Sequence, residues 1–183
     1  MFKKVEEHDV FKGDFIHVVR SRFETVDSFE FEREYIVHPG AVTVVPVDDH
    51  SITYALWQFR APLGKEIFEV CAGKRDVDGE LPHVTAAREL QEELGFTASQ
   101  IIHIGSFFNS PGICDEKTEI YLALGLQKTD TSPQSPEERL MRGASLSLDQ
   151  VPRLVGEGVI MDAKTIVSFY AAINYLKVHP LNA

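Results

Sequence analysis

Three glutamates lie close together in the segment Arg-Glu-Leu-Gln-Glu-Glu, which runs from Arg88 to Glu93. On a helix, Glu89 and Glu93 share one face, and Glu92 is also a neighbour of Glu89. Like charges at these spacings destabilise an isolated helix and call for a compensating charge. Arg88 is placed to pair with Glu92, which leaves Glu89 and Glu93 unpaired. These carboxylates are therefore candidate ligands for a divalent cation.

Magnesium suits such a pair of carboxylates. It prefers oxygen ligands, keeps several waters, and is commonly held by one or two carboxylates together with substrate phosphates. At this position it would polarise a phosphoryl oxygen and orient an attacking water. A run of this kind is, taken alone, more typical of a solvated helix face. The surrounding sequence has to decide between the two interpretations.

The glutamates are expected on an amphipathic helix between Pro82 and Gly95. Proline suits the first turn of a helix, and glycine suits the position just after its last turn. Apolar residues recur at helical spacing and predict the buried face: Val84, Ala87, Leu90 and Leu94.

Strand patterns surround this helix and predict an α/β fold, a sheet with helices on its faces. Buried strands are expected at 41–47 and 52–59, joined as a hairpin by the polar turn 48–51. Further strands are expected at 67–70, 101–108, 119–126 and 144–148, and helices at 149–156 and 163–176. Residues 15–35 alternate loosely with many charges, which predicts half-exposed strands. We expect two parts, N-terminal strands over residues 1–38 and a main domain over 39–183.

The composition narrows the possible partners. The chain has 183 residues and a formal net charge of −10, which argues against a nucleic-acid backbone as a partner. The two cysteines do not form a CxxC pair, so we expect free thiols in a reducing compartment. The charged N-terminus has no apolar segment typical of a secretory signal, and apolar runs are too short to span a bilayer. A cytoplasmic protein without a membrane partner is expected.

A longer pattern around the glutamates resembles the signature of the Nudix hydrolase family. That signature reads Gly, five residues, Glu, seven residues, then Arg-Glu-apolar-x-Glu-Glu-x-Gly-apolar. The span from Glu80 to Phe96 matches it in full, with one departure before it, because six residues separate Gly73 from Glu80. An extra residue is tolerated in the loop that precedes the helix. The matching positions are Gly73, Glu80, Arg88, Glu89, Leu90, Glu92, Glu93, Gly95 and Phe96.

The resemblance implies a Nudix-type α/β/α sandwich with a mixed central sheet and metal-dependent cleavage of a diphosphate bond. It implies metal ligands at Glu89 and Glu93, with Glu92 as a third that the family uses variably. The carbonyl of Ala72 resembles the family's backbone ligand, and Cys71 stands where related sequences have proline. Mg²⁺ is the implied cofactor, with Mn²⁺ as an alternative. By the same resemblance, Arg88 and Glu80 orient the ligands.

A second similarity points to the ADP-ribose pyrophosphatase branch. Pro111 lies sixteen positions after Gly95, and the segment from Pro111 to Glu116 resembles the branch's Pro-Gly-x-x-Asp-Glu loop. Pro111-Gly112 alone would be typical of an ordinary turn. The segments 38–42 and 58–60 also resemble this branch. The implied reaction is hydrolysis of ADP-ribose to AMP and ribose 5-phosphate.

The resemblance also suggests roles for residues outside the helix. The general base is expected from a mobile acidic loop, with Glu138 preferred over Glu137, although both glutamates fit equally well as solvated charges. Arg60 and Arg33 are candidate substrate contacts, because a guanidinium forks onto phosphate oxygens. Each arginine fits equally well as a structural ion-pair partner.

The N-terminal strands are implied to form a homodimer and to complete the partner's site. Phe31, with Phe29 and Tyr35, is a candidate platform for adenine, but aromatic residues at alternating strand positions more often serve packing. Two alternative functions remain at this point. One is cleavage of another nucleotide sugar or an oxidised nucleotide, and the other is non-catalytic nucleotide sensing on the same fold.

Overall fold

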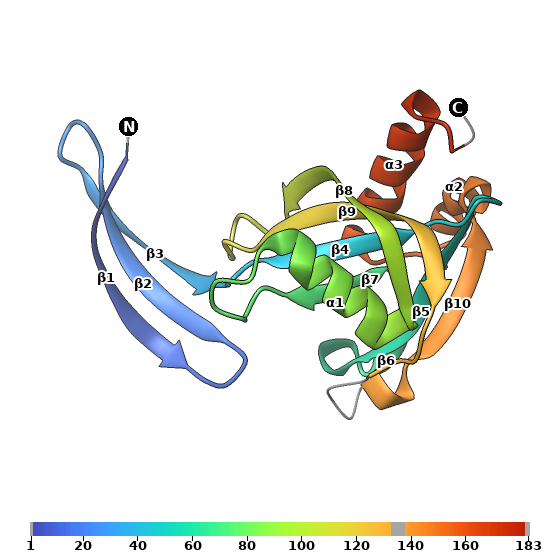
Figure 1. Ribbon diagram of the computed structural model, residues 1–183. Coiled ribbons are helices and arrows are strands. Elements are labelled where there is room, and N and C mark those ends of the chain that lie inside the picture. Colours follow the sequence, from blue (N-terminus) through green and yellow to red (C-terminus); the bar gives the residue numbers. More distant parts are fainter. Residues whose placement is uncertain (1, 133–137, 182–183) are drawn as a thin grey trace. The chain divides into compact units, whose positions relative to one another are not determined.

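The computed structural model describes residues 2–132 and 138–181, apart from the side chain of Glu138. These residues form two compact units (Figure 1). Unit 1 comprises Met1–Gly40 and Phe108–Lys117, and unit 2 comprises Ala41–Phe107 and Thr118–Ala183.

Unit 1 contains an antiparallel sheet in the order β1-β2-β3, formed by Lys3–Lys12, His17–Glu24 and Glu30–Val37. The two later strands were expected from the alternation in residues 15–35. Strand β1 was not expected, because all ten of its residues are exposed and burial imposes no pattern on them. The segment 108–117 joins this unit through a parallel bridge between Ile36 and Cys114.

The main sheet of unit 2 has the order β7-β4-β9-β8. Its strands are β4 (Ala41–Pro46), β7 (Cys71–Lys74), β8 (Phe96–Phe108) and β9 (Lys117–Lys128). Strand β4 runs parallel to β9 and antiparallel to β7, so the sheet is mixed as expected. Residues 42–47 are buried, because helices cover both faces of this strand.

Helix α1 (Pro82–Leu94) and helix α3 (Ala163–Val178) cover opposite faces of this sheet. Val42 and Val44 pack in a cluster with Leu90 of α1. The intervening residues face α3, where the Thr43 hydroxyl lies 2.8 Å from that of Ser168. This alternation follows from the two-residue period of a strand.

A second sheet has the order β10-β5-β6, formed by Arg142–Ser147, Ile52–Arg60 and Lys65–Glu69. The predicted hairpin of 41–47 with 52–59 is wrong, because β4 and β5 belong to different sheets. Only an isolated bridge between Val47 and Thr53 connects these two segments. Strand β4 already has β7 and β9 on its two edges, so no edge remains for β5.

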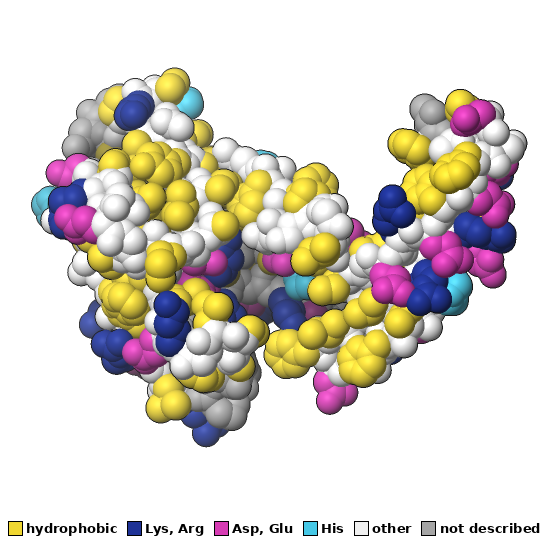
Figure 2. Space-filling model, turned by 180° about the vertical axis from the view of Figure 1, so that it is seen from behind, with side chains coloured by type: hydrophobic (Ala, Val, Ile, Leu, Met, Phe, Trp, Pro, Cys, Tyr) yellow, Lys and Arg dark blue, Asp and Glu magenta, His cyan; other side chains and the backbone are white. Residues whose placement is uncertain are grey.

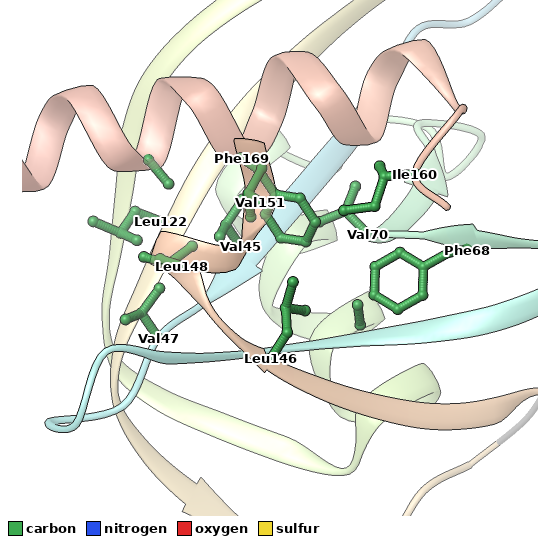
Figure 3. Packing of buried hydrophobic residues seen from close by; sticks show 12 residues of the cluster. Val45, Val47, Phe68, Val70, Leu122, Leu146, Leu148, Val151, Ile160 and Phe169 are labelled. Atoms are coloured by element: carbon green, nitrogen blue, oxygen red, sulfur yellow. The ribbon is translucent and has the colours of Figure 1, made fainter. Parts of the chain in front are cut away.

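The larger core lies between the two sheets and the C-terminal helices α2 (Val151–Gly156) and α3. Phe169 points from α3 into this cluster, beside Val70 and Ile160 (Figure 3). Its side chain is fully buried, and burial of a phenylalanine contributes roughly 1.5–3 kcal/mol. Short 3-10 helices η1, η2 and η3 span Ala61–Leu63, Glu138–Leu140 and Leu148–Gln150. No helix in the described ranges is long and apolar enough to cross a membrane.

Helix α1 begins at Pro82 and is followed by Gly95 in the left-handed conformation, as its sequence predicts. Its predicted buried face is wrong in part. Leu90 is buried, but Val84 is 44% exposed, and the helix instead buries Thr85 and Ala86. Ala86 packs in the cluster that joins the helix to the sheet, and the carboxyl group of Glu89 lies over Gly73 of β7.

Candidate active site

A single arginine connects three carboxylates on and before helix α1. The Nη1 group of Arg88 donates to Glu89 at 2.8 Å and to Glu92 at 2.9 Å. Its Nε and Nη2 groups donate to Glu80 at 3.3 and 3.2 Å. The pairing of Arg88 with Glu92 was expected, but the expectation that Glu89 lacks a partner is wrong. The guanidinium is near enough to serve both.

The hydrogen bonds between Arg88 and Glu80 shift the pKa values of these two residues in opposite directions. Hydrogen bonds from Arg88, and then from the Thr85 hydroxyl at 2.8 Å, lower the pKa of Glu80. The hydrogen bond to Glu80 is the largest cause that raises the pKa of Arg88. One cation for three anions leaves the cluster with a net negative charge. Such a site attracts a further cation.

Gly73 is the position on β7 over which Glu89 lies. A Cβ atom added to Gly73 would lie 2.0 Å from the carboxyl carbon of Glu89 and 2.1 Å from its Oε1 atom. No real side chain fits at such a distance. A side chain at residue 73 would therefore displace the flexible carboxyl group of Glu89, which occupies the place that this side chain would take.

Glu93 approaches the same strand one residue earlier. The amide nitrogen of Ala72 donates to Oε2 of Glu93 at 3.1 Å. Cys71, the next residue back, is fully buried, and burial followed by the charge of Glu93 raises the pKa of its thiol. The side chain of Cys71 packs in the cluster that contains Leu90 of α1. Glu89 and Glu93 thus converge on the backbone of Ala72 and Gly73.

The donor set around β7 fits a hard divalent cation. In the part of the chain that the structure describes, no three histidine, cysteine or carboxylate side chains form a ready-made metal cage. Mg²⁺ does not need one, because it takes one or two carboxylates and keeps water and phosphate oxygens as its other ligands. The absence of a side chain at Gly73 lets the carboxyl group of Glu89 lie against the strand, where it could serve as one of these carboxylates.

Arg60 lies at the end of β5 and binds Glu69 at the end of β6. Its Nε and Nη2 groups each donate to one oxygen of Glu69 at 2.6 Å. The arginine side chain is 39% exposed, whereas that of Glu69 is 1% exposed. Hydrogen bonding to Glu69 is the largest cause that raises the pKa of Arg60, and the nearby charge of Glu93 adds to it. The ion pair was one of the two roles expected for Arg60.

Within unit 1, Phe31 and Arg33 contact each other and their own sheet. The guanidinium of Arg33 lies 4.8 Å from the centroid of the Phe31 ring and donates to the Glu32 carbonyl. Phe31 also stacks on Phe23 at 5.5 Å and meets the edge of Phe2 at 5.7 Å. Within the sheet of unit 1, both side chains therefore pack on their own neighbours.

The loop that contains Pro111 and Gly112 borders an open pocket of about 260 Å³ in unit 1. The amides of Ile113 and Cys114 donate to the Ser110 carbonyl at 3.0 and 2.9 Å and shape the turn. Gly112 has open space around it, so its glycine is not required by local contacts. The pocket is lined by Tyr35, Phe108, Pro111, Cys114 and Asp115.

The expected general bases fall at the edge of the described chain. Glu137 lies outside the described residues. Glu138 begins η2, and its side chain is not among those described. Their assignment therefore remains a prediction.

Two charged residues near the site were missed from the sequence, Glu69 and Lys164. Glu69 follows Phe68 in a short strand, and the pattern gives no sign that it is buried. Its partner Lys164 lies 95 residues later, on α3. The only local signal was a charged residue between two apolar ones, Phe68 and Val70.

Comparison with known proteins adds an independent line of argument. Residues 37–166 match the family model described as NUDIX domain. The chain is 34% identical over 175 residues to the ADP-ribose pyrophosphatase of Bacillus subtilis, covering 96% of this chain and 92% of that protein. The same identity and coverage hold for the methanol dehydrogenase activator of Bacillus methanolicus. An ADP-ribose pyrophosphatase of Mycobacterium tuberculosis is 36% identical over 139 residues, which are 76% of this chain and 67% of that one.

A solved structure supports the fold. The crystal structure of an ADP compounds hydrolase has a TM-score of 0.85 and covers 98% of this chain and 96% of its own, at 19% sequence identity. The expected α/β sandwich with a mixed central sheet is confirmed.

Proposed function

The chain belongs to the NUDIX family and is a Nudix pyrophosphohydrolase, and we propose that its substrate is ADP-ribose, which it cleaves to AMP and ribose 5-phosphate. The observation that carries the proposal is the convergence of Glu89 and Glu93 on the strand end at Ala72 and Gly73. The choice of ADP-ribose is supported by two relatives with that activity in their names and by the spacing of Pro111 from the helix.

Nudix hydrolases generally need a divalent metal, and we propose Mg²⁺ here, with Mn²⁺ as an alternative. The residues that would hold it are Glu89, Glu93 and the carbonyl of Ala72, with Glu92 as a variable fourth ligand. When bound, the metal supplies charge neutralisation and polarisation of the phosphoryl oxygens. Arg88 and Glu80 keep the carboxylates oriented, because their hydrogen bonds restrict the rotation of Glu89 and Glu92.

Water activation is proposed for Glu138, with Glu137 as the alternative. Either carboxylate would accept a proton from the attacking water once the loop brings it within hydrogen-bond distance. Glu93 is the third residue proposed to act directly in the reaction. Its position against β7 supports this role.

Substrate contacts are proposed in each unit separately. Arg60 in unit 2 would bind a phosphate oxygen, which its partly exposed side chain supports. In unit 1, Pro111 and Gly112 would border the bound substrate, which the pocket beside Pro111 supports. Phe31 and Arg33 would offer an aromatic and cationic surface for the adenosine part.

We also propose that the protein is a homodimer formed through the sheet of unit 1. Strand β1 is exposed along its whole length and presents Val5, Val10 and Phe11 to solvent. Figure 2 shows hydrophobic side chains on the surface of this sheet. A three-stranded sheet with this much exposed apolar surface is typical of an interaction site.

We place the enzyme in the cytoplasm, which its two free cysteines support.

A substrate screen tests the proposed function. The full-length protein is incubated with Mg²⁺ and a panel of nucleoside diphosphate derivatives, and AMP and ribose 5-phosphate are measured by chromatography. ADP-ribose is expected to give the highest kcat/KM. Preference for another nucleotide sugar or an oxidised nucleotide would contradict the substrate assignment. Binding of ADP-ribose by calorimetry without turnover would indicate a sensor instead.

A further inference from the structure

Glu69 is a buried carboxylate that the proposed reaction does not use directly. It is 1% exposed, and a buried charge is costly unless it is paired and hydrogen-bonded. Arg60 donates one hydrogen bond to each carboxylate oxygen of Glu69, both at 2.6 Å. Lys164 donates a third hydrogen bond to the Oε2 atom of Glu69. This buried anion is therefore shared by two cations from different elements.

Lys164 occupies a position that does not favour a cation. It lies in the first turn of α3, where the positive end of the helix dipole disfavours positive charge. The cap itself is provided by Asp162, which accepts from the amide of Thr165 at 2.9 Å and from its hydroxyl at 2.6 Å. Lys164 also lies 2.9 Å from Asp162, and its side chain is 16% exposed. The lysine thus destabilises the helix in which it lies, and its ion pairs with Glu69 and Asp162 offset this effect.

Arg60 is only partly enclosed, since its side chain keeps some exposed surface. Glu69 accepts hydrogen bonds from the Nε and Nη2 groups of the Arg60 guanidinium. The Nη1 group is not used by Glu69, and 39% of the arginine side chain is exposed. An arginine held in this way by a buried carboxylate presents its remaining N–H donors in a fixed direction. Fixing a donor before the ligand binds reduces the entropy lost on binding.

We propose that Lys164 is a positioning residue for the diphosphate: its ammonium group fixes Glu69, and Glu69 fixes Arg60 in the orientation that binds a phosphate oxygen. The inference rests on the proposed function, which gives Arg60 its phosphate contact. The lysine does not touch substrate. Its effect reaches the diphosphate only through the chain Lys164–Glu69–Arg60, which makes that effect dependent on Arg60.

A double-mutant cycle tests this dependence. Lys164→Met is expected to raise KM for ADP-ribose about tenfold with little change in kcat, because Arg60 binds substrate and transition state alike. Arg60→Lys is expected to raise KM by at least as much. The double variant is expected to resemble Arg60→Lys alone, because the effects of residues acting through one another are not additive.

Controls separate positioning from a structural role. Lys164→Arg keeps the positive charge, and its KM is expected to lie close to the wild-type value. Lys177→Met removes an exposed lysine from the last turn of the same helix and is expected to leave KM unchanged. If Lys164→Met does not fold, Lys164→Gln, which keeps an N–H donor, takes its place in the same cycle. An unchanged KM, or an equal rise of KM in the Arg60→Lys background, would overturn the inference.

A second measurement does not depend on the substrate. Exchange of the Arg60 Nε proton with water is followed by NMR in the wild type and in Lys164→Met. Faster exchange in the variant is expected, because Glu69 is no longer fixed, and unchanged exchange would overturn the positioning role. Absence of ADP-ribose hydrolysis by the wild type would instead contradict the proposed function, so the two failures are distinguishable.

Discussion

Two charged clusters, one in each unit, differ in their balance of negative charge and hydrogen-bond donors. At α1, the single cation Arg88 contacts three carboxylates, Glu80, Glu89 and Glu92. In the sheet of unit 1, the single carboxylate Glu7 accepts hydrogen bonds from three donors, Lys4, Ser21 and Tyr35. The first cluster keeps an excess of negative charge, and the second satisfies its only anion.

The net charge of a cluster of charged side chains therefore indicates function better than the number of its ion pairs. The sheet of unit 1 also contains exposed pairs of Arg20 with Glu34 and of Arg22 with Glu6 and Glu30. Exposed pairs of this kind contribute at most about 1 kcal/mol each. The cluster at α1 differs because its carboxylates outnumber their arginine partner and because Glu89 lies against strand β7. Four predictions test whether this difference holds, beginning with the largest expected effect.

Glu93→Gln is expected to produce the largest loss. The amide can still accept the hydrogen bond from Ala72, so the fold is kept, but a ligand charge is removed. We expect kcat with Mg²⁺ to fall by roughly a thousandfold, a loss similar to removal of a strong electrostatic stabiliser. Steady-state kinetics with circular dichroism as the folding control measures this. Glu157→Gln, on an exposed helix end, serves as the matched control. Near-normal activity at saturating Mg²⁺ would contradict the assignment of Glu93 as a metal ligand.

Glu138→Gln extends the comparison to the acidic loop. A general base contributes about a hundredfold or more to the rate, so kcat is expected to fall by that factor while KM changes little. The same substitution at Glu137 is expected to have a small effect. Measurement of kcat and KM for both variants decides between them, and a large effect of Glu137→Gln alone would transfer the role of base to that residue.

Gly73→Ala tests the space that the acidic cluster requires. The added methyl group would occupy the place of the Glu89 carboxyl group, which must swing away. Because Glu89 is flexible, we expect a fall in Tm of less than about 5 °C. The kcat is expected to fall about a hundredfold. Gly156→Ala, where an added Cβ atom meets open space, is the control. Unchanged kcat would show that the position of Glu89 is not important.

The smallest effect is expected at Glu7. Hydrogen bonds from Lys4, then Tyr35 and then Ser21, lower its pKa to about 2 from the ordinary 4.5. Its folded pKa is lowered, so its contribution to stability is present above pH 4.5 and is lost as the pH falls toward 2. NMR titration of the Glu7 carboxyl group measures the midpoint, and Tyr35→Phe is expected to raise it by removing one donor. A wild-type midpoint near 4.5 would contradict the stabilisation of the Glu7 carboxylate by these three donors.

Much of the fold could be predicted from local patterns. The bounds of α1 were predicted because Pro82 and Gly95 mark a helix through their own backbone geometry. Most strands of unit 2 were predicted from their apolar runs, but β7 was missed because it is short and contains Gly73. The family resemblance located the acidic residues. The buried face of α1 was predicted only in part, because small residues such as Ala86 become buried when the sheet, and not the helix, decides which side packs.

Local sequence was sufficient for the features that depend on neighbours in the chain: the helix, its ends, and the spacing of Glu89 and Glu93. Tertiary structure alone decided the features that depend on distant segments. It assigned β4 and β5 to different sheets, placed Glu89 over Gly73, and joined Lys164 to Glu69. The physical reason is that backbone preferences act over a few residues, whereas the pairing of a buried charge is fixed only when whole elements pack together.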